Sequence, residues 1–221
     1  MKSPRPLLIF GTGDLARSLS RCMREDGDLR QIAFCVDEAY IDERRIDDLE
    51  VVPFERVSET HPPSEVDILV ATGYHRVNFS RAEIVGRCKQ AGYSLSSYIG
   101  AQVIKCVSLE HGENCIIFNG ANLHPFVSLG DDVILWGNCH VGHHTRIDSH
   151  VFIASGSVAG RSHIGGYTFL GCGSWVTDGV TIGKGNIIGA GVTISHDTGD
   201  NEVYRLPKAK PSPVSSERMW T

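Results

Sequence analysis

The sequence predicts a chain in two parts, a small Rossmann-like parallel α/β domain over residues 1–100 and a left-handed parallel β-helix over residues 101–198, followed by an extended tail over residues 199–221. Two observations support this prediction. In the first hundred residues, short apolar runs alternate with helical patterns, which is typical of a parallel sheet covered by helices. Beyond residue 117, a branched aliphatic residue returns every six residues, a period that neither an α-helix nor an alternating strand produces but that a β-helix does.

The amino-terminal domain begins with an apolar run, Leu7–Phe10, that predicts a buried strand. Gly11, Thr12 and Gly13 follow and predict a tight turn into a helix. Four apolar residues then recur at helical spacing: Leu15, Leu19, Cys22 and Met23. A glycine turn of this kind exposes amides that can bind a phosphate group, although the same turn also occurs wherever a strand simply bends into a helix.

A second strand is expected over Ile32–Val36, and it ends at Asp37, near the position where an acidic side chain meets a ribose hydroxyl in nucleotide-binding βαβ units. Further along, the pattern predicts an irregular strand over 51–57, a buried strand over 67–72 and a last strand over 93–99. The domain is too short for the two halves that bind a dinucleotide. A mononucleotide, such as that of a nucleotide-sugar, is the ligand we expect.

The buried strand ends at Gly73, and a helix is expected from Ser80. Its apolar face holds Ile84, Val85 and Cys88. Gly73 is also expected to contact the nucleotide-sugar. The residues predicted to bind this substrate in the domain are Gly11, Thr12, Gly13, Asp37 and Gly73.

The aliphatic residues of the repeat form two registers, and the step between them, from Ile153 to Val158, is five residues rather than six. One corner of the coil is therefore expected to be tighter. Residues 101–114 contain imperfect hexads and predict the first, frayed coil, while the proline-rich tail is expected to be extended and to cap the open end. The repeat positions are Ile117, Leu123, Leu129, Leu135, Val141, Ile147 and Ile153, then Val158, Ile164, Leu170, Val176, Ile182, Ile188 and Ile194.

Composition narrows the classes of partner. The formal net charge is −5, 21% of residues are charged, and no basic run occurs, which argues against nucleic acid or an acidic membrane surface as the partner. Seven scattered cysteines without a Cys-x-x-Cys pair favour neither a disulfide framework nor a zinc site, and they indicate a cytoplasmic protein. Gly11 and Asp14 end the first apolar run too early for a signal peptide or a membrane span.

Nearly the whole chain resembles the bacterial sugar acyltransferases of the sialic acid O-acetyltransferase and nucleotide-aminosugar N-acetyltransferase type. Singly, none of the matching motifs is specific, but together they are. The matching segments are Phe10–Gly13, Val36–Asp37, Ala71–Gly73 with Asn78 and Arg81, Gly92–Tyr98, Gly142–His144 and Ile188–Gly191. The resemblance implies a homotrimer that binds acetyl-CoA between neighbouring β-helices and a nucleotide-linked sugar against the amino-terminal domain.

The resemblance also assigns roles to residues of the β-helix. His143 is expected to be the general base that takes a proton from the attacking amine or hydroxyl, a role that suits a neutral imidazole near pH 7. Phe152 stands at a coenzyme-contacting position that is often histidine in the family. Main-chain amides near Cys172, Gly173 and Ala190 are expected to contact the coenzyme, and the alternative for these residues is ordinary cornering of the coil.

Many relatives follow the base with an acidic residue, whereas this chain has His144. A second imidazole can orient His143 through a hydrogen bond, but it supplies no negative charge for the imidazolium. Asp148 or a main-chain carbonyl is the substitute that the sequence suggests. Asn138, one corner earlier, is expected to bind the sugar or the oxyanion, or only to complete a corner.

We therefore expect an acetyl-CoA-dependent acyltransferase that N-acetylates a nucleotide-linked aminosugar by direct attack on the thioester, without a metal and without a cysteine nucleophile. O-acetylation of a sugar such as sialic acid is the first alternative. The second is a β-helical scaffold that binds a nucleotide-sugar and has lost turnover. A metal enzyme similar to the γ-class carbonic anhydrases is the third, but His144 and His150 occupy equivalent positions in consecutive hexads and should project from different faces, so they cannot meet within one chain.

Overall fold

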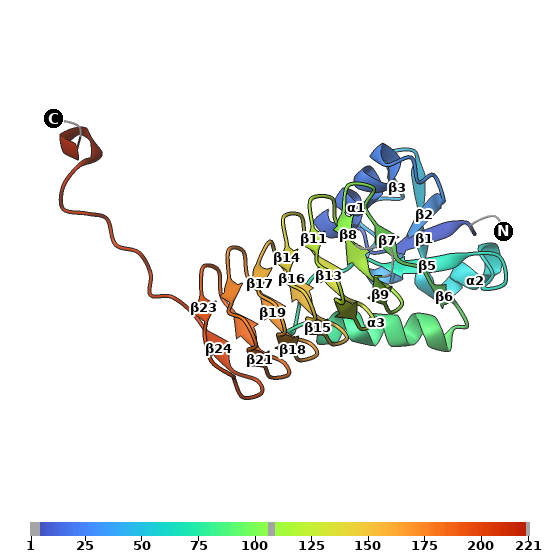
Figure 1. Cartoon of the computed structure of the whole chain (residues 1–221). Coiled ribbons are helices and arrows are strands. Elements are labelled where there is room, and N and C mark those ends of the chain that lie inside the picture. Colours follow the sequence, from blue (N-terminus) through green and yellow to red (C-terminus); the bar gives the residue numbers. More distant parts are fainter. Residues whose placement is uncertain (1–4, 106–108, 220–221) are drawn as a thin grey trace.

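The computed structural model describes residues 5–105 and 109–219. A sheet with helices forms one part of the molecule, and a parallel β-helix with triangular coils extends away from it (Figure 1). The predicted fold class is therefore confirmed. Residues 106–108, which belong to the imperfect hexads of the first coil, lie outside the described residues. Among the described residues, no helix is both long and apolar enough to span a membrane.

Six strands form the α/β sheet in the order β3-β4-β2-β1-β5-β6. All neighbours pair in parallel except β3, which runs antiparallel to β4. This order places β1 at the centre, with β2 on one side and β5 on the other. The bounds are β1 Leu7–Phe10, β2 Gln31–Val36, β3 Arg45–Ile46, β4 Leu49–Pro53, β5 Asp67–Val70 and β6 Ser94–Leu95.

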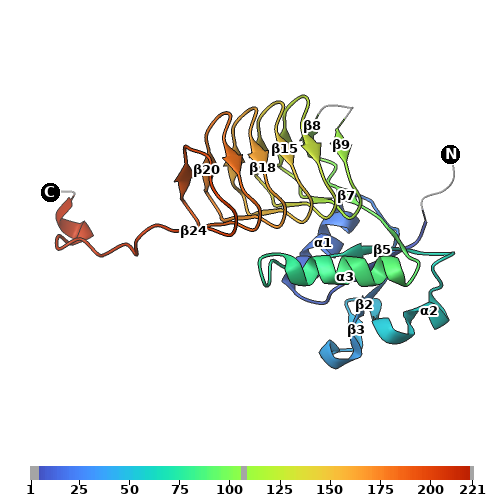
Figure 2. The ribbon, with the colours of Figure 1, turned by 90° about the horizontal axis from the view of Figure 1, so that it is seen from below.

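Two helices cover opposite faces of this sheet (Figure 2). Because side chains alternate along a strand, α1 (Asp14–Glu25) packs on the face that carries Leu7 and Ile9, and α3 (Phe79–Gln90) packs on the face that carries Leu8 and Phe10. Both helices were expected from the sequence. The remaining helical segments are short: α2 Val57–Thr60, and the 3-10 turns η1 Glu38–Tyr40, η2 Phe54–Arg56 and η3 Ser216–Met219.

The β-helix has three sheets of two-residue strands. The first sheet faces the α/β domain and comprises β7 Tyr98–Ile99, β10 Ile116–Ile117, β13 Ile134–Leu135, β16 Phe152–Ile153, β19 Phe169–Leu170, β22 Ile187–Ile188 and β24 Val203–Tyr204. The second comprises β8 Ile104–Lys105, β11 Asn122–Leu123, β14 His140–Val141, β17 Ser157–Val158, β20 Trp175–Val176 and β23 Thr193–Ile194. The third comprises β9 Glu110–His111, β12 Ser128–Leu129, β15 Arg146–Ile147, β18 His163–Ile164 and β21 Thr181–Ile182.

Every repeat position predicted from the six-residue period points into the coil and is buried, with no side chain more than 6% exposed. Each such residue contributes roughly 1.5–3 kcal/mol by leaving water. The short step is also present, since β16 ends at Ile153 and β17 ends at Val158. At this tightened corner Ser155 takes a left-handed backbone conformation, and its hydroxyl donates to the Gly137 carbonyl at 2.6 Å.

Three corners join the sheets, and their names are used below. The first corner joins the first and second sheets and consists of residues 118–121, 136–139, 154–156, 171–174 and 189–192. The second corner joins the second and third sheets and consists of residues 124–127, 142–145, 159–162, 177–180 and 195–198. The third corner joins the third and first sheets and consists of residues 112–115, 130–133, 148–151, 165–168 and 183–186.

The prediction of one strand over 93–99 is wrong. The α/β sheet ends with β6, and β7 already belongs to the first sheet of the β-helix. Two serines make the transition, because the Ser96 amide donates to the Ile68 carbonyl on one side and the Ser97 hydroxyl accepts from the Cys115 amide on the other. The tail was expected to cap the β-helix, but only β24 pairs with the last coil, and residues 205–218 are exposed and lead away from it (Figure 1).

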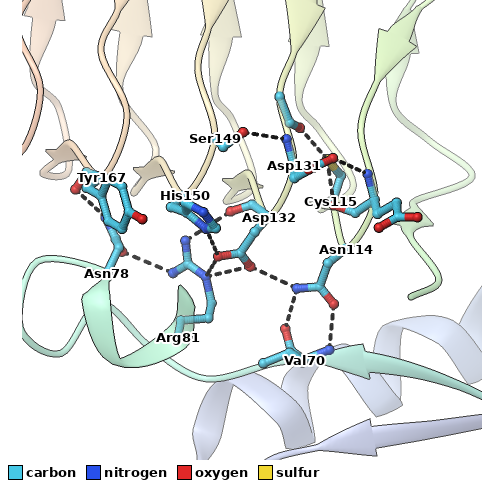
Figure 3. Close-up of polar contacts among 12 residues, drawn as sticks. Val70, Asn78, Arg81, Asn114, Cys115, Asp131, Asp132, Ser149, His150 and Tyr167 are labelled. Carbon is cyan, nitrogen blue, oxygen red and sulfur yellow. Dashed lines mark hydrogen bonds and ion pairs between the residues drawn. The ribbon is translucent and has the colours of Figure 1, made fainter. Parts of the chain in front are cut away.

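A buried polar cluster fixes the angle between the two parts (Figure 3). The Arg81 guanidinium, from α3, donates to the Asp132 carboxylate at 2.8 and 2.9 Å, and both side chains are fully buried. Asp132 also accepts from Asn114 at 2.8 Å, and Asn114 in turn bonds the main chain of Val70 in β5. Asn78, from the turn before α3, donates to the carbonyl of Tyr167 at 2.8 Å. The α/β domain is thus held to the third corner of the coil.

Candidate functional site

The glycine turn opens into a cleft at the carboxyl ends of the central strands. Gly11, Thr12 and Gly13 join β1 to α1, Asp37 follows β2, and Gly73 follows β5 shortly after its end, so the predicted residues of this domain meet. The cleft has a volume of about 550 Å³. It lies in the crevice outside the strand ends, where open α/β sheets bind ligands. The remaining residues that line it include Tyr40, Thr72, His75 and Ser80.

The two glycines of the turn have different roles. Gly11 has φ +122°, and a Cβ there would lie 2.7 Å from the Ala71 carbonyl oxygen, so the turn requires glycine. Gly13 is the N-cap of α1, with no side chain capping the helix and no atom within 4 Å of the position its Cβ would take. The first amides of α1 are therefore accessible to an anion.

Asp37 lines this cleft, but its carboxylate already has a partner. Arg87 of α3 donates to both of its oxygens, at 2.9 and 2.5 Å. The hydrogen bond to Asp37 raises the pKa of Arg87. A ribose hydroxyl would thus have to use the second lone pair of a carboxylate oxygen, which stays free in this arrangement.

A second, apolar cleft of about 370 Å³ lies between the α/β domain and the first corner. Leu15 and Gly73 line both clefts, so the two are neighbours. Phe152 lines its floor and packs edge-on against Tyr74, with ring centroids 5.4 Å apart. The cleft can therefore accept an apolar or weakly polar group next to the glycine turn. Its remaining lining residues are Trp136, Ala154, Ser155 and Cys172.

The other predicted contact residues of the β-helix lie along the first corner. Cys172 is exposed and borders the apolar cleft. Gly173 has φ +67° and Asn138 has φ +62°, so both occupy the left-handed position that turns the coil. Asn138 is exposed, and Ala190 lies one coil beyond Cys172, where the Gly191 amide donates to the Cys172 carbonyl. These positions are explained by cornering, and a ligand contact there is still a prediction.

His143 and His144 lie at the second corner. Their Nδ1 atoms are 3.1 Å apart, so one ring donates to the other, which confirms that His144 can orient His143 through a hydrogen bond. His144 has φ +58° and rests on Phe126, with ring centroids 4.5 Å apart. When Nδ1–H of His143 is the donor in this bond, its Nε2 carries a lone pair and can accept a proton.

Asp148 is not the partner of His143, and this suggestion was wrong. It lies across the third sheet, where its carboxylate accepts from Arg146 at 2.9 Å and pairs with Nε2 of His163 at 2.9 Å. A groove of about 730 Å³ on that sheet contains all three side chains and neither His143 nor the glycine turn. Asp148 follows His143 by only five residues, but the strand between them runs along one side of the triangle, so the two residues lie on different edges of the coil.

Sequence reasoning missed two residues beside His143. Gly160 and Asp178 occupy the same corner one and two coils further along. A complete coil has 18 residues, or 17 where it includes the short step, so counting 17 and then 18 from His143 would have identified both. Nothing in the hexads themselves distinguishes them, because the period identifies inward-pointing residues and says little about those that point outward.

The predicted residues thus form two separate groups. The two clefts and the first corner share one edge of the coil, whereas His143 and His144 lie on another edge with the second sheet between them. Within one chain His143 does not face the glycine turn. His144 and His150 lie at the second and third corners, which confirms that they project from different faces. In the parts of the chain that the structure describes, no group of three or more His, Cys, Asp or Glu residues is arranged to hold a metal ion.

Solved structures with this fold include two acetyltransferases. A mutant of perosamine N-acetyltransferase from Caulobacter crescentus, in complex with CoA and GDP-perosamine, has a TM-score of 0.82 at 23% identity, covering 90% of this chain and 92% of that chain. The acetyltransferase domain of PglB from Neisseria gonorrhoeae, in complex with acetyl coenzyme A, has a TM-score of 0.81 at 21% identity, covering 91% and 96%. Both likenesses extend over the α/β domain and the β-helix together, and they show the fold.

Among curated proteins, the chain is similar to the acyl-acyl-carrier-protein–UDP-N-acetylglucosamine O-acyltransferase of Burkholderia mallei. The two are 31% identical over 93 residues, which is 42% of this chain and 36% of the relative. This chain therefore matches only about a third of that enzyme's length. No family model matches the chain.

Proposed function

We propose that this protein is an acetyl-CoA-dependent N-acetyltransferase that acts on a nucleotide-linked aminosugar, with His143 as general base. The observation that supports it most is the second corner, where a half-buried imidazole is oriented through Nδ1 and presents Nε2. The similar solved structures add support, because they are acetyltransferases that bind CoA or acetyl-CoA and, in one case, GDP-perosamine. The uncapped main-chain amides at the N-terminus of α1 agree with a nucleotide-linked acceptor, because such amides bind phosphate groups.

In the proposed reaction the amino nitrogen attacks the thioester carbonyl directly, and His143 takes a proton from it. No acyl-enzyme is involved. Cys139, the last residue of a first-corner turn, is unsuited to nucleophilic attack because burial raises the pKa of its thiol to about 12, leaving almost no thiolate near pH 7. Cys172 is exposed, but it lies at the first corner, and no imidazole among the described residues is hydrogen-bonded to its thiol to act as its base.

The separation of the two groups of residues supports a homotrimer. A neighbouring copy can bring its clefts and first corner against His143, so that acetyl-CoA lies between two β-helices and the nucleotide-sugar on one α/β domain reaches the base of another chain. The second sheet and second corner expose apolar side chains suited to such contact: Ile104 at 65%, Phe126 at 75% and Trp175 at 46%. We also place the protein in the cytoplasm, on the scattered cysteines of its sequence.

O-acetylation of a sugar hydroxyl is the second candidate for the same site, because the base would serve both acceptors. The short match to an O-acyltransferase favours it. The bound aminosugar of the perosamine enzyme favours the amine, and its match covers more than twice as much of this chain.

A thiol-release assay tests the proposal. Acetyl-CoA is incubated with uridine, guanosine, thymidine and cytidine diphosphate or monophosphate sugars, each with and without a free amine. We expect release only with an aminosugar. His143→Asn should cut kcat about 10²–10⁴-fold, the contribution of a general base, while calorimetric binding of acetyl-CoA stays intact. Binding of both ligands without turnover would indicate the inactive scaffold instead, and release with a hydroxyl sugar would indicate the O-acetyltransferase.

A further inference from the structure

The second corner stacks His143, Gly160 and Asp178 on three successive coils. Main-chain bonds fix this stack: the Arg161 amide donates to the His143 carbonyl at 2.8 Å, and the Gly179 amide donates to the Gly160 carbonyl at 2.9 Å. Gly160 therefore lies between the coil that carries the imidazole and the coil that carries the carboxylate.

Gly160 places no side chain of its own between His143 and Asp178. A Cβ at this position would lie 2.8 Å from both Cε1 and Nε2 of His143 and 3.0 Å from Oδ1 of Asp178. The backbone of Gly160 is not left-handed, so the glycine is required for space and not for a turn. Because Nε2 of His143 and Oδ1 of Asp178 each lie within 3.0 Å of this Cβ position, the two atoms are less than about 6 Å apart.

The His143 imidazole and the Asp178 carboxylate do not hydrogen-bond to each other. Asp178 is exposed, and its carboxylate makes no hydrogen bond or ion pair with any residue that the structure describes. Arg161, the cationic residue of the intervening coil, likewise forms no ion pair within residues 5–105 and 109–219. The Nδ1 of His143 is engaged by His144. One nitrogen atom of a ligand can lie between Nε2 and Oδ1 at hydrogen-bonding distance from both, since such bonds measure about 2.7–3.2 Å.

We propose that this gap is the binding site for the acceptor's amino group, with Asp178 as the residue that binds its positive charge. This inference rests on the proposed function and specifies its substrate as an amine. An ammonium group has three N–H donors and a positive charge, so it can donate to the carboxylate and to Nε2 at once. A hydroxyl has one donor and no charge, and donating to His143 would leave Asp178 without a partner.

The proton balance is complete with these groups. The bound ammonium gives one proton to Nε2 of His143, and the neutral amine attacks the thioester carbonyl carbon. A C–N bond forms, the tetrahedral intermediate collapses, and the C–S bond breaks. The second N–H proton goes to the departing thiolate, giving free CoA thiol and the amide. The Asp178 carboxylate lies near the new imidazolium, where it supplies the negative charge that His144 does not.

Asp178→Asn tests this assignment, because it removes the charge while keeping the shape. With the best aminosugar nucleotide of the thiol-release panel, we expect kcat/KM to fall about 10- to 100-fold, the effect of losing one hydrogen bond between charged groups, mainly through a higher KM for the acceptor. The KM for acetyl-CoA should not change, because Asp178 is assigned to the acceptor. Asp178→Glu should restore part of the loss.

Glu110→Gln is the matched control, since it neutralises an exposed carboxylate of the third sheet that makes no bond within the described residues. It should behave like the unaltered protein. Equal kcat/KM for Asp178→Asn and the unaltered protein, with His143→Asn inactive, would overturn the role of Asp178 alone. Absence of thiol release with every amine acceptor would overturn both this inference and the proposed function.

Discussion

Replacing Gly160 with alanine should slow acetyl transfer without unfolding the protein. The added methyl group would lie 2.8 Å from Cε1 and Nε2 of His143. The imidazole is the mobile end of a side chain, so it yields before the coil does. It must retreat by about 0.6 Å to reach the 3.4 Å of ordinary contact, a movement that also strains its 3.1 Å bond to His144.

The expected loss follows from this displacement. Misplacing a reacting group by about 1 Å costs roughly 10²-fold in rate, so we expect kcat to fall about 10- to 100-fold. Stability should be unchanged or slightly higher, because alanine loses less backbone entropy on folding than glycine and the conformation of Gly160 suits it. Thiol release and thermal unfolding, measured on the same preparation, separate the two effects.

Gly86→Ala in α3 is the control, because no atom lies within 4 Å of the position its Cβ would take. It should leave the rate unchanged and stabilise the helix by up to about 1 kcal/mol. If Gly160→Ala turned over acetyl-CoA as fast as the unaltered protein, the imidazole would not need the position seen in the structure, and the assignment of His143 as base would lose its geometric support.

Two further predictions concern stability. Arg81→Met should lower the free energy of unfolding by about 3–5 kcal/mol in urea denaturation, because it leaves the fully buried Asp132 carboxylate without its cation, whereas Arg21→Met on the exposed face of α1 should have no detectable effect. The hydrogen bond from Arg30 holds the pKa of Asp28 below its usual range, so this carboxylate stabilises the fold above about pH 4 and the contribution disappears as the pH falls further. Thermal unfolding between pH 3 and 7 should accordingly depend less on pH in Asp28→Asn than in the unaltered protein, and parallel curves would contradict the assignment.

The sequence predicted the coil almost residue by residue, because every hexad has to place one aliphatic side chain in a narrow interior. The same steric requirement made the five-residue step after Ile153 visible. The sequence did not predict where the α/β sheet ends, because Tyr93–Ile99 has the pattern of one strand, whereas β6 and β7 within it pair with different sheets. The pairing of a two-residue strand depends on contacts with residues that are distant in the sequence. A local pattern of apolar residues does not indicate which strand will be the partner.

The polar residues of the junction illustrate the same limit. Asn78 and Arg81 were noted from the sequence only as parts of a resemblance, and their partners come from coils more than 50 residues away. Buried charges of this kind are satisfied by tertiary contacts. A cluster that sets the angle between the two parts is therefore found only once the chain has been placed in space.

The second corner shows how the two kinds of information combine. From the sequence, His143 was expected to be the general base, and His144 stood where relatives have an acidic residue. The negative charge for the imidazolium was then expected from Asp148, a residue close to His143 along the chain. In a β-helix the nearest outward-facing neighbours of a corner residue lie one and two coils away, since adjacent coils are hydrogen-bonded and consecutive corners point in different directions. A carboxylate two coils away can act on the imidazole only if the intervening residue has no side chain. Gly160 meets that condition. Its backbone does not require glycine for the turn, so its role in the proposal is to let Asp178 act on His143.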